Sequence, residues 1–520
     1  MSGREEAPLV QTASTAFERV ADGILGLTVL LFVLAFGALA GILPLGVRLA
    51  GLTLVTVFGI ALGLLGSILL GIAFVSRGGY VETDPDRSAG LGAGLGFGVV
   101  GLVVGGVFGA GITDGVLWIG LSLALGLGMV ALTVLPREDI GSTVPPALVA
   151  LLVGGLLVSG LLDIGWQWQP QAGSFSGGFT AEATVPLLVA FSALLSGWAL
   201  AKARGNFGAP GRERGAFFVV YLIAFGILTV MVAIVAFVTS RGAPYAFRGF
   251  EIVAQFPFVK WPFVMRPFIP LTDRITGILP AIVGTVWLVI GATVFAVPLG
   301  VGAAVFLTEY AEQGRFTRLV ETATSALWST PSVVFGLFGA AFLIPRLGGD
   351  RSLLAGMLVL GFMLLPLVLI TSREAIKSVP DEYRDASAAL GVTKWETIRS
   401  VVLPAAMPGI ITGGILGVGR IAGETAPLIL VLGSTLNSTE AVHVIRGFEF
   451  VMHPPFITNE AILTESAALP TQIWAIISAG VSGSPARGWA TAFILLCIVL
   501  SFYAVGIASR TYFRRKLDYE

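Results

Sequence analysis

The feature that most constrains this chain is a series of long, uninterrupted apolar segments. Crossing a hydrocarbon core of about 30 Å takes ~20 residues of helix, and segments of that length recur throughout the 520-residue sequence. Charged residues make up only 12% of the chain, against about 25% in soluble domains. The segments do not alternate in hydrophobicity, which argues against a closed β-barrel. We therefore predict an all-α polytopic membrane protein.

About twelve transmembrane helices are predicted. They cover residues 23–43, 49–75, 90–112, 115–135, 146–165, 183–201, 216–238, 277–307, 323–345, 353–372, 404–432 and 489–509. Lysine and arginine favour cytoplasmic loops, and a cytoplasmic N-terminus puts most of the basic residues on the inner side. We therefore expect both termini in the cytoplasm of a multi-pass cell-membrane protein.

A polar linker, "KARGNFGAPGRERG", divides the predicted helices into two sets of six. We place the domain boundary here, between an N-terminal membrane region of unknown function at residues 1–205 and a second domain at residues 206–520. The first set is rich in glycine, as in "GLGAGLGFGVVGLVVGGVFGAG", and small residues at helical spacing let membrane helices pack closely. We expect no chemistry in this half.

A second polar insert, at residues 241–276, mixes aromatic, proline and basic residues and is predicted to lie outside. Two interpretations are compatible with this composition. The segment lies in the headgroup layer, where amphipathic rings settle, or it forms a docking surface for an external partner.

The most informative segment is the cytoplasmic loop after the tenth predicted span, "SREAIKSVPDEYRDASAALGVTKWETIRSVVLPAAMPG". Ser378 is expected to cap a first helix, which Gly391 ends in a left-handed conformation. Thr393 and Glu396 form a capping box that starts a second helix. This helix is expected to end before Pro404. A simple connection needs only about 2–8 residues, so a loop of this length has a function of its own.

Residues in this loop resemble the EAA motif, E-A-A-x3-G-x9-I-x-L-P, of permease subunits of ABC importers. The matching positions are Asp385, Ala386, Ser387, Gly391, Val401, Leu403 and Pro404. In that family the loop sits in a cleft of the cytoplasmic ATPase and transmits its closure to the membrane helices. The resemblance therefore implies that residues 373–403 couple the chain to an ATPase.

Three further segments narrow the resemblance: "LPAIVGTVWLVIGATVFAVPLGVGAAVFLTEYA", "STPSVVFGLFG" and "GRIAGETAPL". Together they resemble the A-type permease subunit of phosphate-specific ABC importers, from about Phe217 to the C-terminus but not over residues 1–215. The resemblance implies a type I importer permease core in the last six spans. It also implies three partners: a second homologous permease subunit, a cytoplasmic ATPase dimer and an external phosphate-binding protein.

The chain lacks the residues to hydrolyse ATP. A P-loop needs Gly-Lys-Ser/Thr, and of the five lysines only Lys377 precedes Ser or Thr, with Ile376 before it. We therefore expect no enzyme and no cofactor in this chain, with ATP and Mg bound by the partner ATPase. One cysteine and two histidines make a metal centre improbable, and nothing indicates nucleic-acid binding.

The segment "GRIAGETAPL" places Arg420 and Glu424 one helical turn apart inside an apolar span. An arginine at mid-membrane costs about 2.5–3.5 kcal/mol on insertion scales. Two interpretations are open. The residues form a self-neutralising structural pair, or they line a passage in which the guanidinium meets an oxyanion. Thr425 and a kink at Pro427 would expose backbone groups nearby.

The preceding span holds further candidates for the substrate pathway, Ser329, Thr330 and Ser332. Their hydroxyl groups either contribute donors to the passage or cap a broken helix. We expect the charged residues of the inner loop before this span to form a solvated face; they are Glu309, Glu312, Arg315 and Arg318.

Three functions are compatible with these patterns. The favoured one is a permease subunit that imports inorganic phosphate. The second is a permease for sulfate, molybdate or tungstate. The third is an ion-coupled secondary transporter, although such carriers usually show repeats between their halves, and here only the second half carries the loop and the charged pair.

Overall fold

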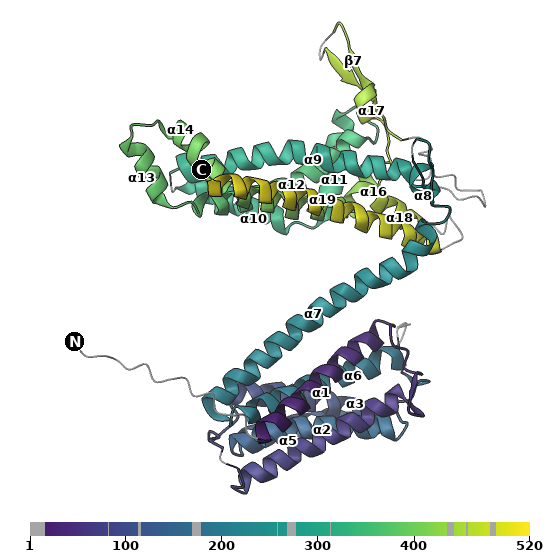
Figure 1. Cartoon of the computed structure of the whole chain (residues 1–520), viewed down its shortest axis with the longest axis vertical. Helices are drawn as coiled ribbons and strands as arrows, with labels where there is room; N and C mark the ends of the chain where they lie inside the picture. Colours follow the sequence, from purple (N-terminus) through teal and green to yellow (C-terminus); the bar gives the residue numbers. More distant parts are fainter. Residues whose placement is uncertain are drawn as a thin grey trace. The chain divides into compact units, whose positions relative to one another are not determined.

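We analysed a computed structural model of the chain (Figure 1). It describes residues 16–81, 83–112, 116–168, 178–256, 258–267, 277–312, 314–433, 441–453, 456–478 and 485–519. The chain divides into two compact units, Met1–Phe237 and Val238–Glu520. The division falls within helix α7, Gly208–Ala246. The predicted boundary after residue 205 lies before this helix, and where the permease domain begins stays a prediction.

Unit 1 is a bundle of paired helices that continues into α7. Its other helices are α1 (Ala16–Leu39), α2 (Leu54–Arg77), α3 (Leu91–Ile112), α4 (Leu117–Val134), α5 (Glu138–Val158) and α6 (Ala181–Arg204). Helix α1 packs on α6, α2 on α5 and α3 on α4. Two short antiparallel hairpins join helices, β1–β2 (Arg48–Leu49 with Leu52–Thr53) and β3–β4 (Gln167–Trp168 with Phe179–Thr180).

The glycines of α3 explain its close contact with α4. A Cβ atom added at Gly101 would lie 2.5 Å from the Leu125 carbonyl oxygen, and one at Gly105 would lie 2.7 Å from the Ser122 Cα atom. No side chain fits there without moving the helices apart. The predicted packing role of this glycine-rich segment is therefore confirmed.

Unit 2 contains the remaining helices, several of them interrupted. They are α8 (Pro262–Met265), α9 (Leu279–Val305), α10 (Arg315–Ser329), α11 (Ser332–Phe338), α12 (Leu353–Lys377), α13 (Asp381–Ala389), α14 (Lys394–Thr397), α15 (Leu403–Ala422), α16 (Ala426–Val431), α17 (Glu460–Leu463), α18 (Leu469–Ser478) and α19 (Pro485–Tyr519). Three π-helical turns extend these helices: η1 (Phe306–Tyr310), η2 (Gly339–Leu343) and η4 (Ile398–Val402). Short 3₁₀ turns lie at η3 (Ile344–Arg346) and η5 (Ile445–Gly447). The hairpins are β5–β6 (Glu251–Ile252 with Val259–Lys260) and β7–β8 (Phe448–Phe450 with Ile457–Asn459).

The core of unit 2 forms where α9, α12, α15 and α16 meet. Three glycines of α15, spaced four residues apart, face α12: Gly409, Gly413 and Gly417. A Cβ atom at Gly409 would lie 2.6 Å from that of Ala375, and the other two positions are tighter still. This small-residue face lets α12 and α15 approach each other closely.

Among the described residues, ten helices are long and apolar enough to cross a membrane, and a bent pair raises the number to eleven. The bent pair, Arg315–Ser329 with Ser332–Arg346, turns by 102°. The remaining predicted span, 90–112, appears as a shorter apolar helix over Leu91–Gly106. The prediction of about twelve helices thus agrees with the fold, apart from this short helix.

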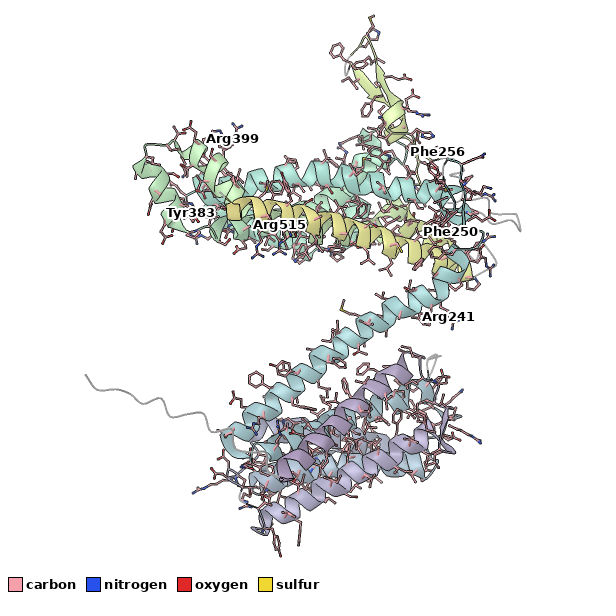
Figure 2. All side chains as sticks on the ribbon, in the orientation of Figure 1. Arg241, Phe250, Phe256, Tyr383, Arg399 and Arg515 are labelled. Carbon is pink, nitrogen blue, oxygen red and sulfur yellow. The ribbon has the colours of Figure 1, made fainter. Side chains whose placement is uncertain are left out.

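The two ends of unit 2 carry different side chains. Figure 2 shows Tyr383 and Arg399 of the loop at residues 373–403, the predicted coupling loop, at one end of the helices. Phe250 and Phe256 of the aromatic insert at residues 241–276 lie at the other end. In the insert, Phe247 stacks on Trp261 with ring centroids 5.0 Å apart, and Phe256 is 87% exposed. Both interpretations of the insert stay open, and residues 257 and 268–276 lie outside the described part.

Candidate functional site

Two helix breaks meet in unit 2. The first lies between α10 and α11 at residues 330–331, and the second between α15 and α16 at residues 423–425. Pro331 and Pro427 stand at the beginnings of the new helices, where a missing N–H costs little. A Cβ atom at Gly336 of α11 would lie only 2.6 Å from the Pro427 Cα atom of α16. The two short helices after the breaks are therefore packed directly on each other.

Arg420 lies in the last turn of α15, just before the second break. Its guanidinium carbon is 4.4 Å from the centre of the Trp328 ring, in the last turn of α10. Its Nε atom is 3.9 Å from Oε1 of Glu424, which is an ion pair but too long for a hydrogen bond. The side chains of Arg420 and Glu424 are 37% and 19% exposed. The guanidinium is thus neither sealed among aliphatic neighbours nor neutralised by a close contact.

The backbone that carries Arg420 is held by close packing. A side chain at Gly419 would collide with the Tyr503 hydroxyl of α19. On the neighbouring face, Gly417 lies against Leu364 of α12. Because α15 is packed closely between these two helices, the backbone position of Arg420 is well defined.

The other predicted pathway residues surround the breaks. Ser329 and Thr330 both donate hydrogen bonds from their hydroxyls to the Ala326 carbonyl, at 3.0 and 2.8 Å. These bonds stay within the last turn of α10, as expected of residues that cap a broken helix. Ser332 is half-buried as the first residue of α11. Thr425 is half-buried at the second break, and its carbonyl accepts from the Ile429 amide at 3.1 Å.

Sequence reasoning missed Trp328. The available signal was its place directly before "STPS", the segment that breaks the span. The contact with Arg420 joins residues far apart in sequence and depends on how the two breaks pack.

The coupling loop contains two of the predicted local features. Gly391 has φ +72°, the left-handed conformation that glycine adopts without strain. Thr393 and Glu396 form the capping box with both hydrogen bonds present.

Two other predictions about the loop are wrong. Ser378 ends α12 and donates to the Ala375 carbonyl, while Pro380 stands at the N-cap of α13. Because Pro380 occupies the N-cap position of α13, no side-chain hydroxyl caps this helix. The second helix does not end before Pro404, because the π-helical turn at Ile398–Val402 leads into α15. The Leu403 amide bonds the Ile398 carbonyl five residues back, which accommodates a proline that cannot donate.

The residues that match the EAA motif occupy different environments. Asp385 and Ala386 are exposed, whereas Ser387 is buried and donates to the Tyr383 carbonyl at 2.9 Å. Leu403 and Pro404 are half-buried where α15 begins. The loop also exposes large apolar side chains, namely Tyr383 at 54%, Leu390 at 83% and Trp395 at 55%. The loop therefore presents an apolar surface next to an acidic one.

A charged contact attaches the loop to η1, the π-helical turn that follows α9. Arg384 pairs with Glu309 at 2.9 Å, and the Glu309 side chain is only 9% exposed. Lys394 donates to the Glu309 carbonyl and lies 5.0 Å from the Tyr310 ring centre. The predicted solvated face is therefore wrong for Glu309. Glu312, Arg315 and Arg318 are exposed, as expected.

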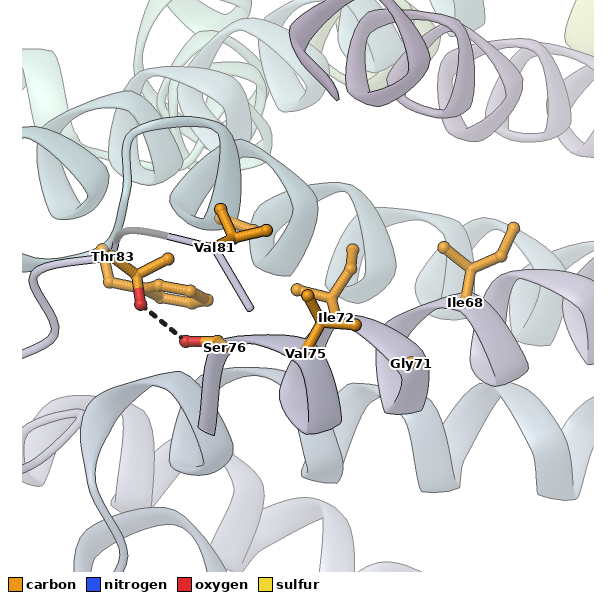
Figure 3. A pocket seen from close by; sticks show the side chains of 9 residues that line it. Ile68, Gly71, Ile72, Val75, Ser76, Val81 and Thr83 are labelled. Atoms are coloured by element: carbon orange, nitrogen blue, oxygen red, sulfur yellow. Dashed lines mark hydrogen bonds between the residues drawn. The ribbon is translucent and has the colours of Figure 1, made fainter. Parts of the chain in front are cut away.

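Unit 1 contains charged side chains that the sequence analysis did not single out. Lys202 of α6 pairs with Glu138 of α5 at 2.7 Å, and their side chains are 1% and 0% exposed. Beside this pair, a cavity of about 280 Å³ lies between α2 and Phe207 (Figure 3). Its lining is apolar except where Ser76 and Thr83 share a hydrogen bond of 2.8 Å. Both residues lie just outside the predicted spans, Glu138 before residues 146–165 and Lys202 after residues 183–201.

Comparison with known proteins places the second half in a family. Residues 296–519 match the family described as binding-protein-dependent transport system inner membrane component. The chain is 40% identical over 211 residues to phosphate transport system permease protein PstA 1 of Mycobacterium tuberculosis, covering 37% of this chain and 69% of that protein. It is 30% identical over 247 residues to phosphate transport system permease protein PstA of Haemophilus influenzae, covering 48% of this chain and 79% of that protein.

A third relative, probable ABC transporter permease protein YqgI of Bacillus subtilis, is 42% identical over 147 residues. That match covers 28% of this chain and only half of the relative. The protein is a multi-pass ABC importer permease in its second half. It belongs to the binding-protein-dependent transport system inner membrane component family, and its known relatives include the PstA permeases. The predicted fold class and family resemblance are confirmed, and the secondary-transporter alternative loses its support.

Proposed function

We propose that this chain is the transmembrane permease subunit of an ATP-driven ABC importer that moves inorganic phosphate into the cytoplasm. The observation that carries the proposal is the half-exposed guanidinium of Arg420 at the meeting point of two broken membrane helices. The names of the PstA relatives support phosphate as the substrate.

The chemistry of the site suits a travelling anion. A guanidinium presents a planar set of donors that matches the oxygens of phosphate. Glu424, 3.9 Å away, lowers the local positive charge without occupying the donors. An anion that binds too strongly cannot leave, so a weakly opposed arginine suits transport better than an unopposed one.

The coupling loop supplies the connection to an ATPase. In our proposal the exposed loop surface around Asp385 and Ala386 docks into a cytoplasmic ATPase, and Gly391 sets the angle between the two short helices. Ser387, Leu403 and Pro404 hold the loop to α15. The Arg384–Glu309 pair carries its movement to α9. ATP and Mg belong to that ATPase, and this chain itself performs no hydrolysis.

We propose three partners: a second homologous permease subunit, a cytoplasmic ATPase dimer and an external phosphate-binding protein. The second permease would cover the exposed apolar side chains of α10 and α11, which are Phe316, Leu319, Val333 and Leu337. Residues 206–520 form the permease domain in this proposal, with both termini in the cytoplasm. Residues 1–205 take no part in the transport chemistry that we propose.

The test is uptake of radiolabelled phosphate in cells that lack their own importer and express the chain with its partner subunits. We expect Arg420→Ala to lower uptake about 10- to 100-fold, the value of losing a charged hydrogen bond, at unchanged membrane abundance. Arg315→Ala is the matched control, because Arg315 is an exposed arginine of the same unit. Unchanged uptake in Arg420→Ala would remove the residue from the pathway.

Competition separates phosphate from the alternative oxyanions, since a guanidinium also binds sulfate, molybdate and tungstate. Excess unlabelled phosphate should abolish the uptake of radiolabelled phosphate, and the other three anions should not.

A second variant tests the coupling of ATP hydrolysis to uptake. Asp385→Lys reverses the exposed charge of the loop, and we expect ATP hydrolysis to continue while uptake falls.

A further inference from the structure

We infer that Trp328 is a positioning residue for Arg420: its indole ring holds the guanidinium so that the edge carrying the donors is presented to the anion. This inference rests on the proposed function. Trp328 does not touch the anion in our proposal, and acts only through the arginine.

The geometry fits a stacked cation. The guanidinium carbon lies 4.4 Å from the Trp328 ring centre, within the roughly 6 Å over which an aromatic face attracts a cation, and tryptophan is the best of the aromatic residues for this. The ring therefore lies on one side of the guanidinium carbon. The guanidinium carries five N–H donors, and those turned away from the ring are free for an anion.

Glu424 cannot provide this orientation. Its closest carboxylate oxygen is 3.9 Å from Arg420 Nε, beyond the roughly 2.7–3.2 Å of a directional hydrogen bond. An ion pair at that distance attracts the arginine without fixing its plane. The indole ring is thus the contact that sets how the guanidinium is turned.

The contact is not an ordinary core contact. Trp328 is 39% exposed and the Arg420 side chain 37% exposed. A ring needed only for packing would lie among apolar neighbours, whereas this one shares an open surface with a charged group. Both residues also lie in the last turn before a helix break.

Helix α10 is itself held in place at its other turns. Glu321 pairs with Arg373 of α12, and the Thr317 hydroxyl donates to the Glu312 carbonyl at 2.7 Å. Helix α12 ends at Lys377, four residues before α13 of the coupling loop begins. Helix α12 therefore connects the loop to α10 through the Arg373–Glu321 pair.

The test compares Trp328→Tyr with Trp328→Met in the full complex, using radiolabelled phosphate and rates divided by the amount of permease in the membrane. Tyrosine keeps an aromatic face, so we expect uptake near that of the wild type. Methionine keeps apolar bulk without the face, and we expect uptake to fall about 3- to 30-fold. Tyr512→Met, an exposed aromatic near the end of α19, is the matched control and should have no such effect.

A double-mutant cycle supplies a measurement that a purely structural role would not change. In an Arg420→Lys background the compact ammonium has no plane to orient, so Trp328→Met should lower the residual uptake by less than it does in the wild type. Additive effects in this cycle would overturn the inference. Wild-type uptake in Trp328→Met, or equal losses in the Tyr and Met variants, would also overturn it. Should Arg420→Ala leave uptake unchanged, the proposed function itself fails, which is a separate result.

Discussion

Two of the ion pairs among the described residues, Lys202–Glu138 in unit 1 and Arg420–Glu424 in unit 2, differ in almost every respect. Lys202 and Glu138 are 2.7 Å apart and at most 1% exposed. Arg420 and Glu424 are 3.9 Å apart and 37% and 19% exposed. Burial of charge is costly unless every group finds a partner. The first pair is buried and each charge faces the opposite charge at close range, whereas the second pair keeps part of its surface exposed.

The pair in unit 1 is part of a closed network. The second oxygen of Glu138 accepts from the amides of Asp86 and Gly208, both at 2.9 Å. Lys202 also donates to the Ser142 hydroxyl at 2.7 Å and lies 4.9 Å from the Trp198 ring centre. One carboxylate therefore joins the start of α5, the end of α6, the start of α7 and the loop before α3. Both charged groups are buried among groups of the protein, which is the arrangement of a structural pair.

The pair in unit 2 leaves donors unused. Arg420 makes a ring contact and a loose ion pair, although a guanidinium has five N–H groups. Polar groups in apolar surroundings are normally satisfied. In the function that we propose, these donors are available to a travelling anion, whereas the Lys202 ammonium is committed to groups of the protein.

The largest expected effect is on the stability of unit 1. Glu138→Ala leaves Lys202 as an uncompensated buried charge, and we expect a loss of about 3–5 kcal/mol. The measurement is denaturant unfolding of the purified protein in detergent micelles. Glu182→Ala is the control, because Glu182 is exposed in the first turn of α6 and should change stability by less than about 0.5 kcal/mol. Equal stabilities for the two variants would show that the network is not needed.

The next expected effect separates charge from hydrogen bonding. A double variant, Glu138→Gln with Lys202→Met, removes both charges and keeps a carbonyl acceptor for the Asp86 and Gly208 amides. Replacing a buried pair is often close to neutral even when breaking it is not, so we expect a loss of no more than about 1–2 kcal/mol in the same unfolding experiment. A loss as large as that of Glu138→Ala would mean that the charges themselves hold the helices.

The sequence predicted the features that depend on neighbouring residues. The apolar spans, the left-handed Gly391 and the Thr393–Glu396 capping box all follow from local patterns, and the structure contains them. The four-residue spacing of Arg420 and Glu424 likewise predicted that they could reach each other. It did not predict how loosely they would pair.

The features that were missed depend on contacts between distant segments. Glu138 and Lys202 lie in different helices, as do Trp328 and Arg420, and no local pattern relates them. Glu309 was assigned to a solvated face because its neighbours are charged, yet Arg384 of the coupling loop covers it. The end predicted before Pro404 was wrong because the π-helical turn at Ile398–Val402 continues into α15. Such a turn has no sequence signature.

A smaller effect is expected for the stability of unit 2. Arg420→Met removes a stacking contact and a loose ion pair, each worth up to about 1 kcal/mol at exposed sites. We expect a change in unfolding free energy of no more than about 1 kcal/mol, although the same position should matter for uptake. A loss of several kcal/mol would mean that Arg420 has a structural role like the one that we assign to Lys202. The proposed difference between the two ion pairs would then be wrong.

The smallest expected effect concerns the turn that Glu138 holds. Three consecutive residues, Asn206, Phe207 and Gly208, have φ of +58°, +62° and +60°, a conformation that costs residues other than glycine about 1–2 kcal/mol. The Glu138 carboxylate accepts from the Gly208 amide, and the Asn206 carbonyl accepts from the Asp84 amide at 3.0 Å. These bonds offset the strain.

Because Asn206 is exposed, its replacement by glycine relieves strain without opening a cavity. We expect Asn206→Gly to raise the unfolding free energy of the protein by about 0.5 kcal/mol, and Asn206→Ala to lower it by about 0.5–1 kcal/mol, since alanine tolerates this conformation less well than asparagine. In the Glu138→Ala background the turn is no longer held, so the difference between the two substitutions should shrink. An undiminished difference there would mean that the turn keeps its shape without the carboxylate, and that the sealed ion pair acts on the helices alone.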